Sequence, residues 1–347
     1  MGTKKILFIC GSLNQTTMMH KISKHLSEND LFFTPYYSDG IVKKAADKGY
    51  LDFSILGGQF REKTLAYLRK NNLRIDLEGK KNSYDLIITC SDLIIPKNII
   101  NKKVILVQEG MTDKDNIIFY MVKWLKIPNY FAGTSATGFS FKYDYFCVAS
   151  EGYKEFFIRR GLDGDKLVVT GIPNFDNCHH YTFNNFPYKN YILVATSDSR
   201  ETLKYENRKK FIKKCVNIAD GRQLIFKLHP NENVGRATRE IDKYAPGSII
   251  FTSGNINHMI ANCDALITKY STVVYTGIAL GKKVYSDYDL EELKKMLPLQ
   301  NGGISAKNIA VKARELLREK EAHIYQIQKE KLSGKIKNLR KKLLKVA

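Results

Sequence analysis

Short apolar runs alternate with helix-like segments along nearly the whole chain, and this alternation limits the fold more than any other feature. An unbroken apolar run between two helices is typical of a strand in a parallel sheet that is covered on both faces. The first helix pattern, residues 16–26, places Met18, Ile22 and Leu26 on one face. The runs that we predict as strands are residues 4–10, 84–90, 103–108, 143–150, 166–171, 191–196, 222–228, 247–252, 264–269 and 282–287.

The alternation stops once, at the polar and aromatic stretch NFDNCHHYTFNNFPYKN (174–190), and then starts again. Two such sets predict an α/β fold with two doubly wound, Rossmann-like domains that face a cleft. A length of 347 residues agrees with about two domains. We place the N-terminal domain at 1–180, the C-terminal domain at 188–310, and C-terminal helices with a basic amphipathic tail at 311–347.

The tail between residues 329 and 347 is strongly basic, and Leu332, Ile336, Leu339 and Leu343 share one helical face. Such a helix is able to lie on an anionic membrane surface. The alternative is that it packs back on the first domain and exposes its lysines to water. The sequence leaves both open.

The formal net charge of +21 favours an anionic partner. No nucleic-acid-binding motif accompanies the charge, so we do not expect nucleic acid as the main partner. The six cysteines lie far apart without a CxxC pair, which predicts reduced thiols and neither a disulfide framework nor a metal site. No apolar run reaches the length of a membrane span, and no signal-peptide cleavage site follows Cys10. We therefore expect a cytoplasmic protein, with peripheral contact to the inner face of the membrane as one option.

Ligands of open α/β sheets bind beyond the carboxyl ends of the strands. After the first strand, Gly11 permits a tight turn, Asn14 and Gln15 supply side-chain donors, and Thr16 or Thr17 is expected to cap the next helix. Three carboxylates follow other strands of this half and are candidates for a general base. They are Glu109, Asp113 and Asp92.

The second half has polar residues at matching positions. The strand LIFKLHP ends on Lys227 and His229, which alternate and are expected to point to one side and hold phosphate. Ser271 and Thr272 stand where the helix STVVYTGIAL begins, so hydroxyls and free backbone N–H groups there predict a phosphate cradle. Asn257 and His258 are candidates for contact with a nucleobase or ribose. Simple helix capping explains the residues at 257, 258 and 271 as well.

Together these motifs resemble those of GT-B glycosyltransferases, in particular the group of CDP-glycerol glycerophosphotransferases and capsular Kdo transferases. The matching segments are KLHP (227–230) and DALITKYST (264–272), which in that group bind the phosphates of the donor. The segment 146–177 is similar to the end of the first domain in the same group and, more distantly, in UDP-GlcNAc 2-epimerases. Two departures stand out. Glu109 occupies the place of a His-Gly histidine, and the helix after Thr272 lacks the acid that holds a ribose in many relatives.

The resemblance implies a metal-independent, single-displacement transferase without a cofactor. The first domain would bind the acceptor, a cell-surface glycan or lipid-linked hydroxyl, and the second a nucleotide-sugar or a CDP- or CMP-linked donor. A first-domain carboxylate would act as the base, with Lys227, His229, Ser271 and Thr272 on the leaving phosphate. Two alternatives stay open: a UDP-sugar 2-epimerase on the same fold, and a non-catalytic protein that binds anionic lipid or nucleic acid.

Overall fold

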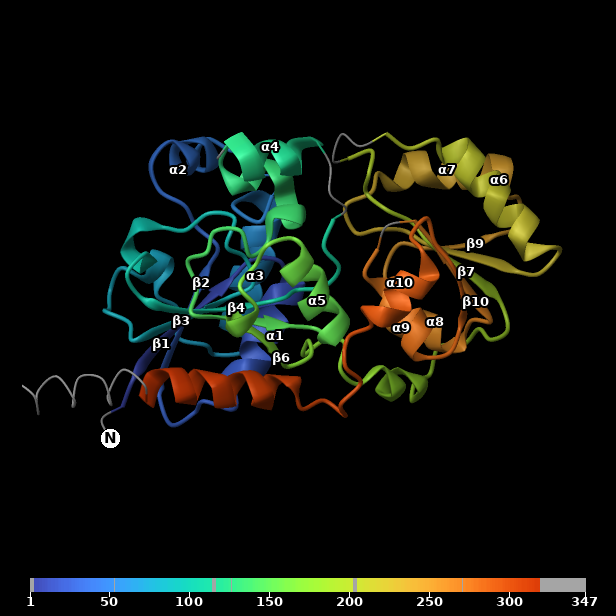
Figure 1. Cartoon of the computed structure of the whole chain (residues 1–347). Helices are drawn as coiled ribbons and strands as arrows, with labels where there is room; N and C mark the ends of the chain where they lie inside the picture. The colour runs from blue at the N-terminus through green and yellow to red at the C-terminus, as the bar shows by residue number, and fades with distance from the viewer. Residues whose placement is uncertain are drawn as a thin grey trace, which may run out of the picture.

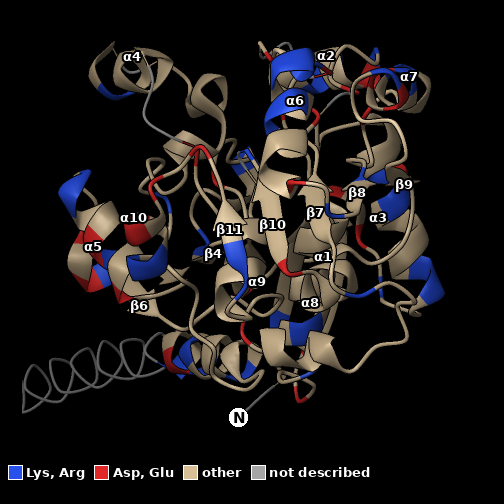
Figure 2. Cartoon of the chain, turned by 90° about the vertical axis from the view of Figure 1, so that its right-hand side faces the viewer, with Lys and Arg blue, Asp and Glu red and all other residues tan. Residues whose placement is uncertain are grey.

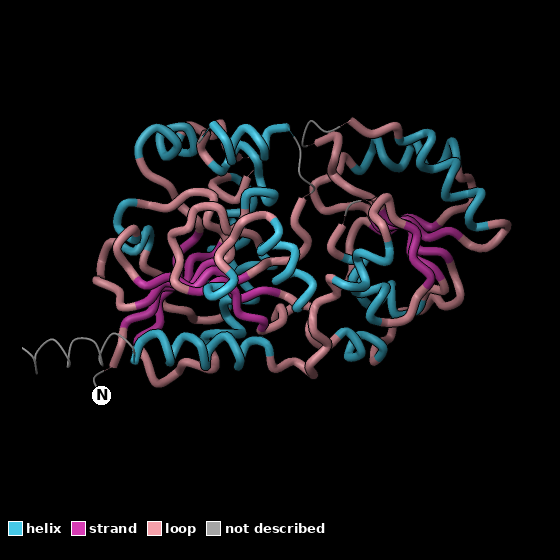
Figure 3. Tube along the Cα trace, viewed as in Figure 1, coloured by secondary structure: helices cyan, strands magenta, loops and turns pink. Residues whose placement is uncertain are grey.

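The first half of the chain contains a sheet of six parallel strands, in the order β2-β1-β3-β4-β5-β6. The computed structural model describes residues 3–52, 54–113, 117–125, 127–201, 205–269 and 271–318. Figures 1 and 3 show the strands as a central layer with helices on both sides. The strands are β1 (Lys5–Cys10), β2 (Asp30–Pro35), β3 (Leu86–Thr89), β4 (Lys103–Val107), β5 (Tyr145–Val148) and β6 (Leu167–Val169).

The second half contains a parallel sheet of five strands, in the order β11-β10-β7-β8-β9. Each sheet reverses its direction of winding once, between β1 and β3 in the first and between β7 and β10 in the second. The predicted fold class, two doubly wound parallel sheets, is therefore confirmed. The strands are β7 (Ile192–Ala195), β8 (Leu224–Lys227), β9 (Ile249–Phe251), β10 (Ala265–Thr268) and β11 (Lys283–Tyr285).

Helices connect the strands and cover the sheets. The α-helices are α1 (Leu13–Ser23), α2 (Gly40–Asp47), α3 (Gly58–Lys70), α4 (Ile117–Leu125), α5 (Glu151–Arg159), α6 (Arg208–Ala219), α7 (Val234–Tyr244), α8 (Ile256–Asn262), α9 (Val273–Ala279) and α10 (Leu290–Lys295). A further helix covers residues 305–318. Short 3-10 helices are η1 (Leu77–Gly79), η2 (Lys97–Ile99), η3 (Asn129–Ala136), η4 (Gly164–Lys166) and η5 (Cys178–Thr182).

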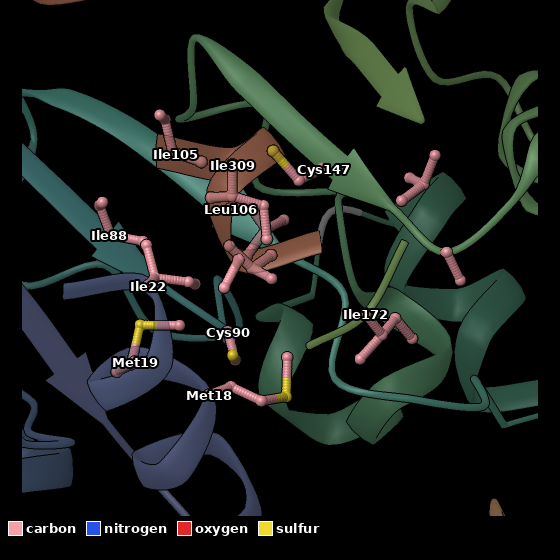
Figure 4. Packing of buried hydrophobic residues seen from close by; sticks show 14 of the residues in the cluster. Met18, Met19, Ile22, Ile88, Cys90, Ile105, Leu106, Cys147, Ile172 and Ile309 are labelled. Atoms are coloured by element: carbon pink, nitrogen blue, oxygen red, sulfur yellow. The ribbon is translucent and has the colours of Figure 1, made fainter. Parts of the chain in front are cut away.

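The main hydrophobic core runs from the first sheet into the second half. In Figure 4, Ile22 of α1 lies beside Ile88 of β3, Met18 lies near Cys90, and Ile309 approaches from the helix 305–318. The same cluster includes Leu266 and Tyr275 of the second half, so the two sheets share one core. Burying a side chain of this size contributes about 1.5–3 kcal/mol, which makes the shared cluster a strong link between the halves. A smaller cluster lies under α6 and α7.

The helix 305–318 returns to the first half after the second sheet is complete. The ammonium of Lys103 donates to Leu316 O over 2.8 Å, and Arg314 pairs with Glu28 over 2.7 Å. Ile309, Ala310 and Ala313 are fully buried. Residues 329–347, for which two placements are predicted, lie outside the described part of the chain. The domain boundaries at 180, 188 and 310 stay a prediction.

Two further observations bear on the sequence-based expectations. All six cysteines lie in the described ranges, and each is a buried, unpaired thiol. Among the described residues, no helix combines the length and the apolar character that crossing a bilayer requires.

Candidate functional site

A cavity of about 500 Å³ lies beyond the carboxyl ends of β1, β3 and β4. Its walls include Asn14 and Gln15 after β1, Ser91 after β3, and residues 108–112 after β4. The boundary between β1 and β3 is the point where the first sheet changes direction, which is where open α/β sheets bind ligands. The volume falls within the range of small-molecule sites.

The carboxylate of Glu109 is fixed in this cavity by three side chains that follow β1. Ser12 Oγ donates to Oε1 over 2.8 Å, and Asn14 Nδ2 donates to the same oxygen over 3.3 Å. Gln15 Nε2 donates to Oε2 over 2.5 Å. A carboxylate has about four acceptor positions, so one position on Oε2 remains for a ligand proton. The structure thus brings together Glu109, Asn14 and Gln15, which were predicted at two separate strand ends.

The start of α1 explains this arrangement. Ser12 is the N-cap, and its Oγ accepts from the backbone N–H of Gln15. The prediction that Thr16 or Thr17 caps this helix is wrong, because the helix begins at Leu13 and both hydroxyls lie inside its first turns. They donate instead to the carbonyls of Ser12 and Asn14.

Gly11 makes room for the side chain of Gln15. A Cβ at position 11 would lie 1.9 Å from Gln15 Oε1 and 2.9 Å from its Cδ. The glycine is needed here for close approach, and its backbone φ lies outside the left-handed region. Gly11 therefore lets Gln15 fold back toward Glu109.

The loop after β4 meets the second half at Thr272. Gln108 is buried and joins two strands, since its Nε2 donates to Gly110 O over 2.8 Å and its Oε1 accepts from Ala149 N over 2.9 Å. A Cβ on Gly110 would come within 2.9 Å of Thr272 Cγ2. Thr272 Oγ1 accepts from Met111 N over 3.4 Å. Thr272 thus forms part of the cavity wall opposite the strand ends of the first sheet.

The other two predicted acids lie differently. Asp113 is next to the cavity, where its Oδ2 accepts from Thr134 Oγ1 over 2.9 Å. Asp92 is buried, and its carboxylate accepts from the backbone N–H groups of Gly138 and Ser140 at 3.0–3.1 Å. Burial raises the pKa of Asp92, and the backbone hydrogen bonds oppose that shift. Asp92 therefore holds the 138–140 turn, and it does not line the cavity with Glu109.

Lys227 and His229 turn toward different neighbours of β8. The ammonium of Lys227 donates to Leu228 O over 2.8 Å and to Thr252 O, after β9, over 3.4 Å. Burial lowers the pKa of Lys227. His229 Nδ1 lies 3.5 Å from a carboxylate oxygen of Asp198, after β7. Each side chain interacts with a different adjacent strand end, and the expectation that both point to one side and hold phosphate stays a prediction.

The remaining predicted residues of the second half lie near α8 and α9. Ser271 is half-buried, and Thr272 precedes α9 without a side-chain cap. Asn257 Oδ1 accepts from Thr276 Oγ1 over 3.2 Å. The His258 ring lies 6.3 Å from the ring of Tyr181, in η5. Asn257 and His258 are thus close to the segment that links the two halves, and neither lines the cavity of Glu109.

Three residues of the cavity region were missed from the sequence: Ser12, Gln108 and Tyr36. Ser12 and Gln15 have the S-x-x-Q spacing of a helix start, which was a usable signal for Ser12. Gln108 had no such signal, because any polar residue can end an apolar run. Tyr36 follows the unpredicted strand β2, and its hydroxyl donates to Ile94 O over 3.0 Å.

Cys90 also lines the cavity, but its chemistry is that of a buried thiol. Burial, with the charge of Glu109 as the second cause, raises the pKa of Cys90. The thiol is therefore protonated and a poor nucleophile or metal ligand. In the part of the chain that is described, no group of three His, Cys, Asp or Glu side chains is placed to hold a metal ion.

No family model matches the chain, and no curated protein is similar to it in sequence. Solved structures are similar in fold. The S. aureus MnaA-UDP co-structure has a TM-score of 0.59 at 12% identity, over 91% of this chain and 97% of that chain. UDP-GlcNAc 2-epimerase from Neisseria meningitidis bound to UDP-GlcNAc has a TM-score of 0.54 at 13% identity, over 90% and 100% of the two chains. The wall teichoic acid polymerase TagF has a TM-score of 0.47 at 13% identity, over 91% and 89%. At these identities the first two matches show the fold, a GT-B-type pair of α/β domains.

Proposed function

We propose that this chain is a transferase that moves a group from a nucleotide-activated donor to an acceptor hydroxyl bound beside Glu109. The observation that supports this most is the cavity itself. Among the described residues that line it, Glu109 is the one acid, and it is held by three neutral donors with one acceptor position unused. A fixed carboxylate with a free lone pair suits a general base that must receive a hydroxyl proton.

In this proposal the acceptor hydroxyl gives its proton to Glu109 and attacks the donor in one displacement. The leaving phosphate gains negative charge, and polar groups at the strand ends of the second half would stabilise it. Thr272 is the member of that set already in the cavity wall. Lys227 would have to exchange a carbonyl partner for phosphate, since its ammonium donates to Leu228 O and Thr252 O. His229, Ser271, Asn257 and His258 are the other donor-binding candidates.

A UDP-sugar 2-epimerase is the second candidate. It is favoured by the neighbours with TM-scores above 0.5, several of which are UDP-GlcNAc 2-epimerases. An epimerase that works by proton transfer and elimination needs acids from both sides of the cleft. Thr272 is the described lining residue that the second half contributes, and it carries no acid. The transferase therefore fits the geometry better.

The first test is calorimetric titration with CMP, CDP, UMP, UDP and GDP, with and without magnesium. We expect one nucleotide to bind without the metal. The matching nucleotide-sugar or CDP-linked donor is then incubated with the protein without an acceptor. Water takes the place of the acceptor hydroxyl, and the slow release of nucleotide by this hydrolysis is measured. Glu109→Gln should bind the nucleotide like wild type and release it about 10²-fold or more slowly, as expected for a lost general base.

Glu78→Gln is the matched control, because Glu78 is also a partly buried carboxylate of the first half, but it is paired with Lys43 and Lys80 and lies outside the cavity. Release at the wild-type rate by folded Glu109→Gln would contradict the role of Glu109. Formation of a 2-epimer from UDP-GlcNAc alone would establish the second candidate. Absence of binding across the whole panel would contradict both.

A further inference from the structure

Helix α4 presents apolar side chains on its outer face as well as on its inner face. Its sequence is IIFYMVKWL, with Lys123 as the single charge. Ile117 is 79% exposed, Trp124 72% and Leu125 67%. A helix that is apolar all round is normally buried on every side. The exposed side of α4 is therefore apolar enough to be buried, although no described residue covers it.

The inner face of α4 is already satisfied. Phe119 and Val122 are buried and pack with Ala132 and Ala136 of η3 in a small core of their own. The guanidinium of Arg160 lies 4.1 Å from the centre of the Phe119 ring. Because these contacts fix how α4 is rotated, the exposed side chains are held outward by packing.

Exposed aromatic residues also lie on η3 and on the turn after it, and the buried Phe119 ring connects them to α4. Ring contacts lead from Trp124 through Tyr120, Phe119 and Phe139 to Phe141, with centroid distances of 5.2–6.0 Å. Phe131 is 57% exposed and Phe141 53%. We refer to the exposed residues of this region as the α4 face: Ile117, Ile118, Tyr120, Met121, Trp124, Leu125, Tyr130, Phe131 and Phe141.

The charged side chains of the segment that carries the α4 face are all positive, while Asp113 lies beside that segment, where it accepts from Thr134 Oγ1. Residues 117–142 contain lysines at 123, 126 and 142 and no Asp or Glu. Lys123 and Lys142 are exposed. Figure 2 shows α4 projecting from the body of the chain with little charged colouring. Trp and Tyr among aliphatic residues, bordered by Lys, are typical of surfaces that enter the interface of a bilayer.

We propose that the α4 face docks on the surface of an anionic lipid bilayer, with its aromatic and aliphatic side chains in the headgroup region. Each lysine near such a surface adds to the attraction, while the apolar side chains supply burial. A second copy of the chain is the other possible cover. An isologous contact would bring the lysines of two copies together without an acid to pair them, which disfavours it.

The α4 face lies close to the cavity of Glu109. Tyr130, Gly133 and Thr134 of η3 line the cavity of Glu109, and η3 packs on α4. A bilayer against α4 therefore lies at the rim of the cavity. If the proposed transferase is correct, its acceptor hydroxyl belongs to a lipid-linked molecule. This last step rests on the proposed function, whereas the docking itself does not.

Trp124 allows a direct test, because it is the one tryptophan of the chain. The full-length protein is mixed with vesicles of phosphatidylcholine alone or with one third phosphatidylglycerol. With the anionic vesicles we expect the emission to move to shorter wavelength and to be quenched by lipids brominated on the acyl chains. Co-sedimentation measures the binding in parallel. No nucleotide is added, so the result is independent of the proposed activity.

The variant Ile117→Asp/Leu125→Asp keeps the tryptophan and should bind the anionic vesicles about 10-fold or more weakly, from the loss of two buried aliphatic side chains. Ile304→Asp/Val311→Asp is the matched control. Those side chains are 48% and 41% exposed and lie at the helix 305–318, at the opposite end of the view from α4 in Figure 1. The control should bind like wild type.

Three results would overturn the docking: equal binding by both double variants, vesicle binding without quenching of Trp124, or no vesicle binding at all. The second would assign lipid binding to the basic segment 329–347. Light scattering that shows a dimer, lost only in Ile117→Asp/Leu125→Asp, would replace the bilayer by a second copy. A folded variant that loses vesicles and keeps nucleotide binding separates the docking from the proposed activity.

Discussion

At the scale of single residues, the main feature is a carboxylate held by neutral groups. Ser12, Asn14 and Gln15 donate to Glu109, which forms no ion pair with another described residue. Neutral donors fix the position of the carboxylate without cancelling its charge. The same three residues belong to the first turn of α1, so the start of one helix determines where the proposed base stands.

Gly11→Ala tests this arrangement. The new methyl group would overlap the end of the Gln15 side chain, which is flexible and can move away. We expect a change in melting temperature of no more than about 4 °C, corresponding to about 1 kcal/mol, together with slower nucleotide release because Glu109 loses a donor. Calorimetry and the release assay measure the two effects.

Gln15→Ala should slow release to a similar extent, and the double variant should be no slower than either single one. Additive losses in the double variant would show that Gly11 acts by another route.

The sequence predicted the members of this site better than their contacts. Glu109, Asn14 and Gln15 were found because each follows an apolar run, and strand ends meet at one edge of a parallel sheet. Which donor reaches which oxygen depends on the start of α1, and that was predicted four or five residues too late. For Lys227 and His229 the sequence predicted the strand end but not the partners, since alternation along a strand does not determine which adjacent strand each side chain contacts.

At the scale of elements, α5 contacts the second half at two points. Tyr153 of α5 and Tyr275 of α9 share a hydrogen bond of 2.6 Å between their hydroxyls. A Cβ on Gly152 would lie 2.1 Å from Lys295 O and 2.7 Å from its carbonyl carbon, at the end of α10. The obstacle is backbone, so it cannot rotate away as a side chain can. The glycine sets how closely α5 approaches α10.

Gly152→Ala should therefore destabilise the fold by about 1–3 kcal/mol, the usual cost of overpacking. Gly235→Ala is the matched control, since Gly235 has the same position in α7 and its added Cβ would make ordinary contacts, with Arg239 Nη1 at 3.6 Å and Asn233 Oδ1 at 3.9 Å. That variant should be neutral or more stable by up to about 1 kcal/mol. Equal melting temperatures for both variants would contradict the close packing of α5 on α10.

Most elements could be predicted from the sequence, because the buried parallel strands are continuous apolar runs. The ten predicted strands all contain an observed one. β2 was missed because its run DLFFTP is short, ends in proline and lies at the sheet edge, where its N-terminal part is only half buried.

At the scale of the whole molecule, the two sheets are joined by one hydrophobic cluster. Residues of β1, β3, β4 and β5 share it with residues of α9 and β10. The interface between the halves is thus built like the inside of a domain. The sequence predicted two units but gave no sign of this shared core, since contacts between helices of different units leave no periodic pattern.

We therefore expect the described part of the chain to unfold in a single thermal transition. Scanning calorimetry should give equal calorimetric and van't Hoff enthalpies. Unfolding of the second half would expose Tyr275 and Leu266, and the first half would then lose the residues that bury Tyr153. Nucleotide should move the whole transition upward. Two separated transitions, with only one shifted by nucleotide, would show that the halves are independent.

The return of the helix 305–318 to the first half has a consequence for synthesis. A chain made from its N-terminus produces β1 to β6 long before residues 309, 310 and 313, which complete their core. Val169 and Ile309 are 140 residues apart. At about 5–20 residues per second, the first sheet would therefore wait roughly 7–28 seconds with part of its core uncovered while the second half emerges. In that interval the nascent chain is most prone to bind other hydrophobic surfaces and aggregate. Packing of the helix 305–318 then completes the core of the first half.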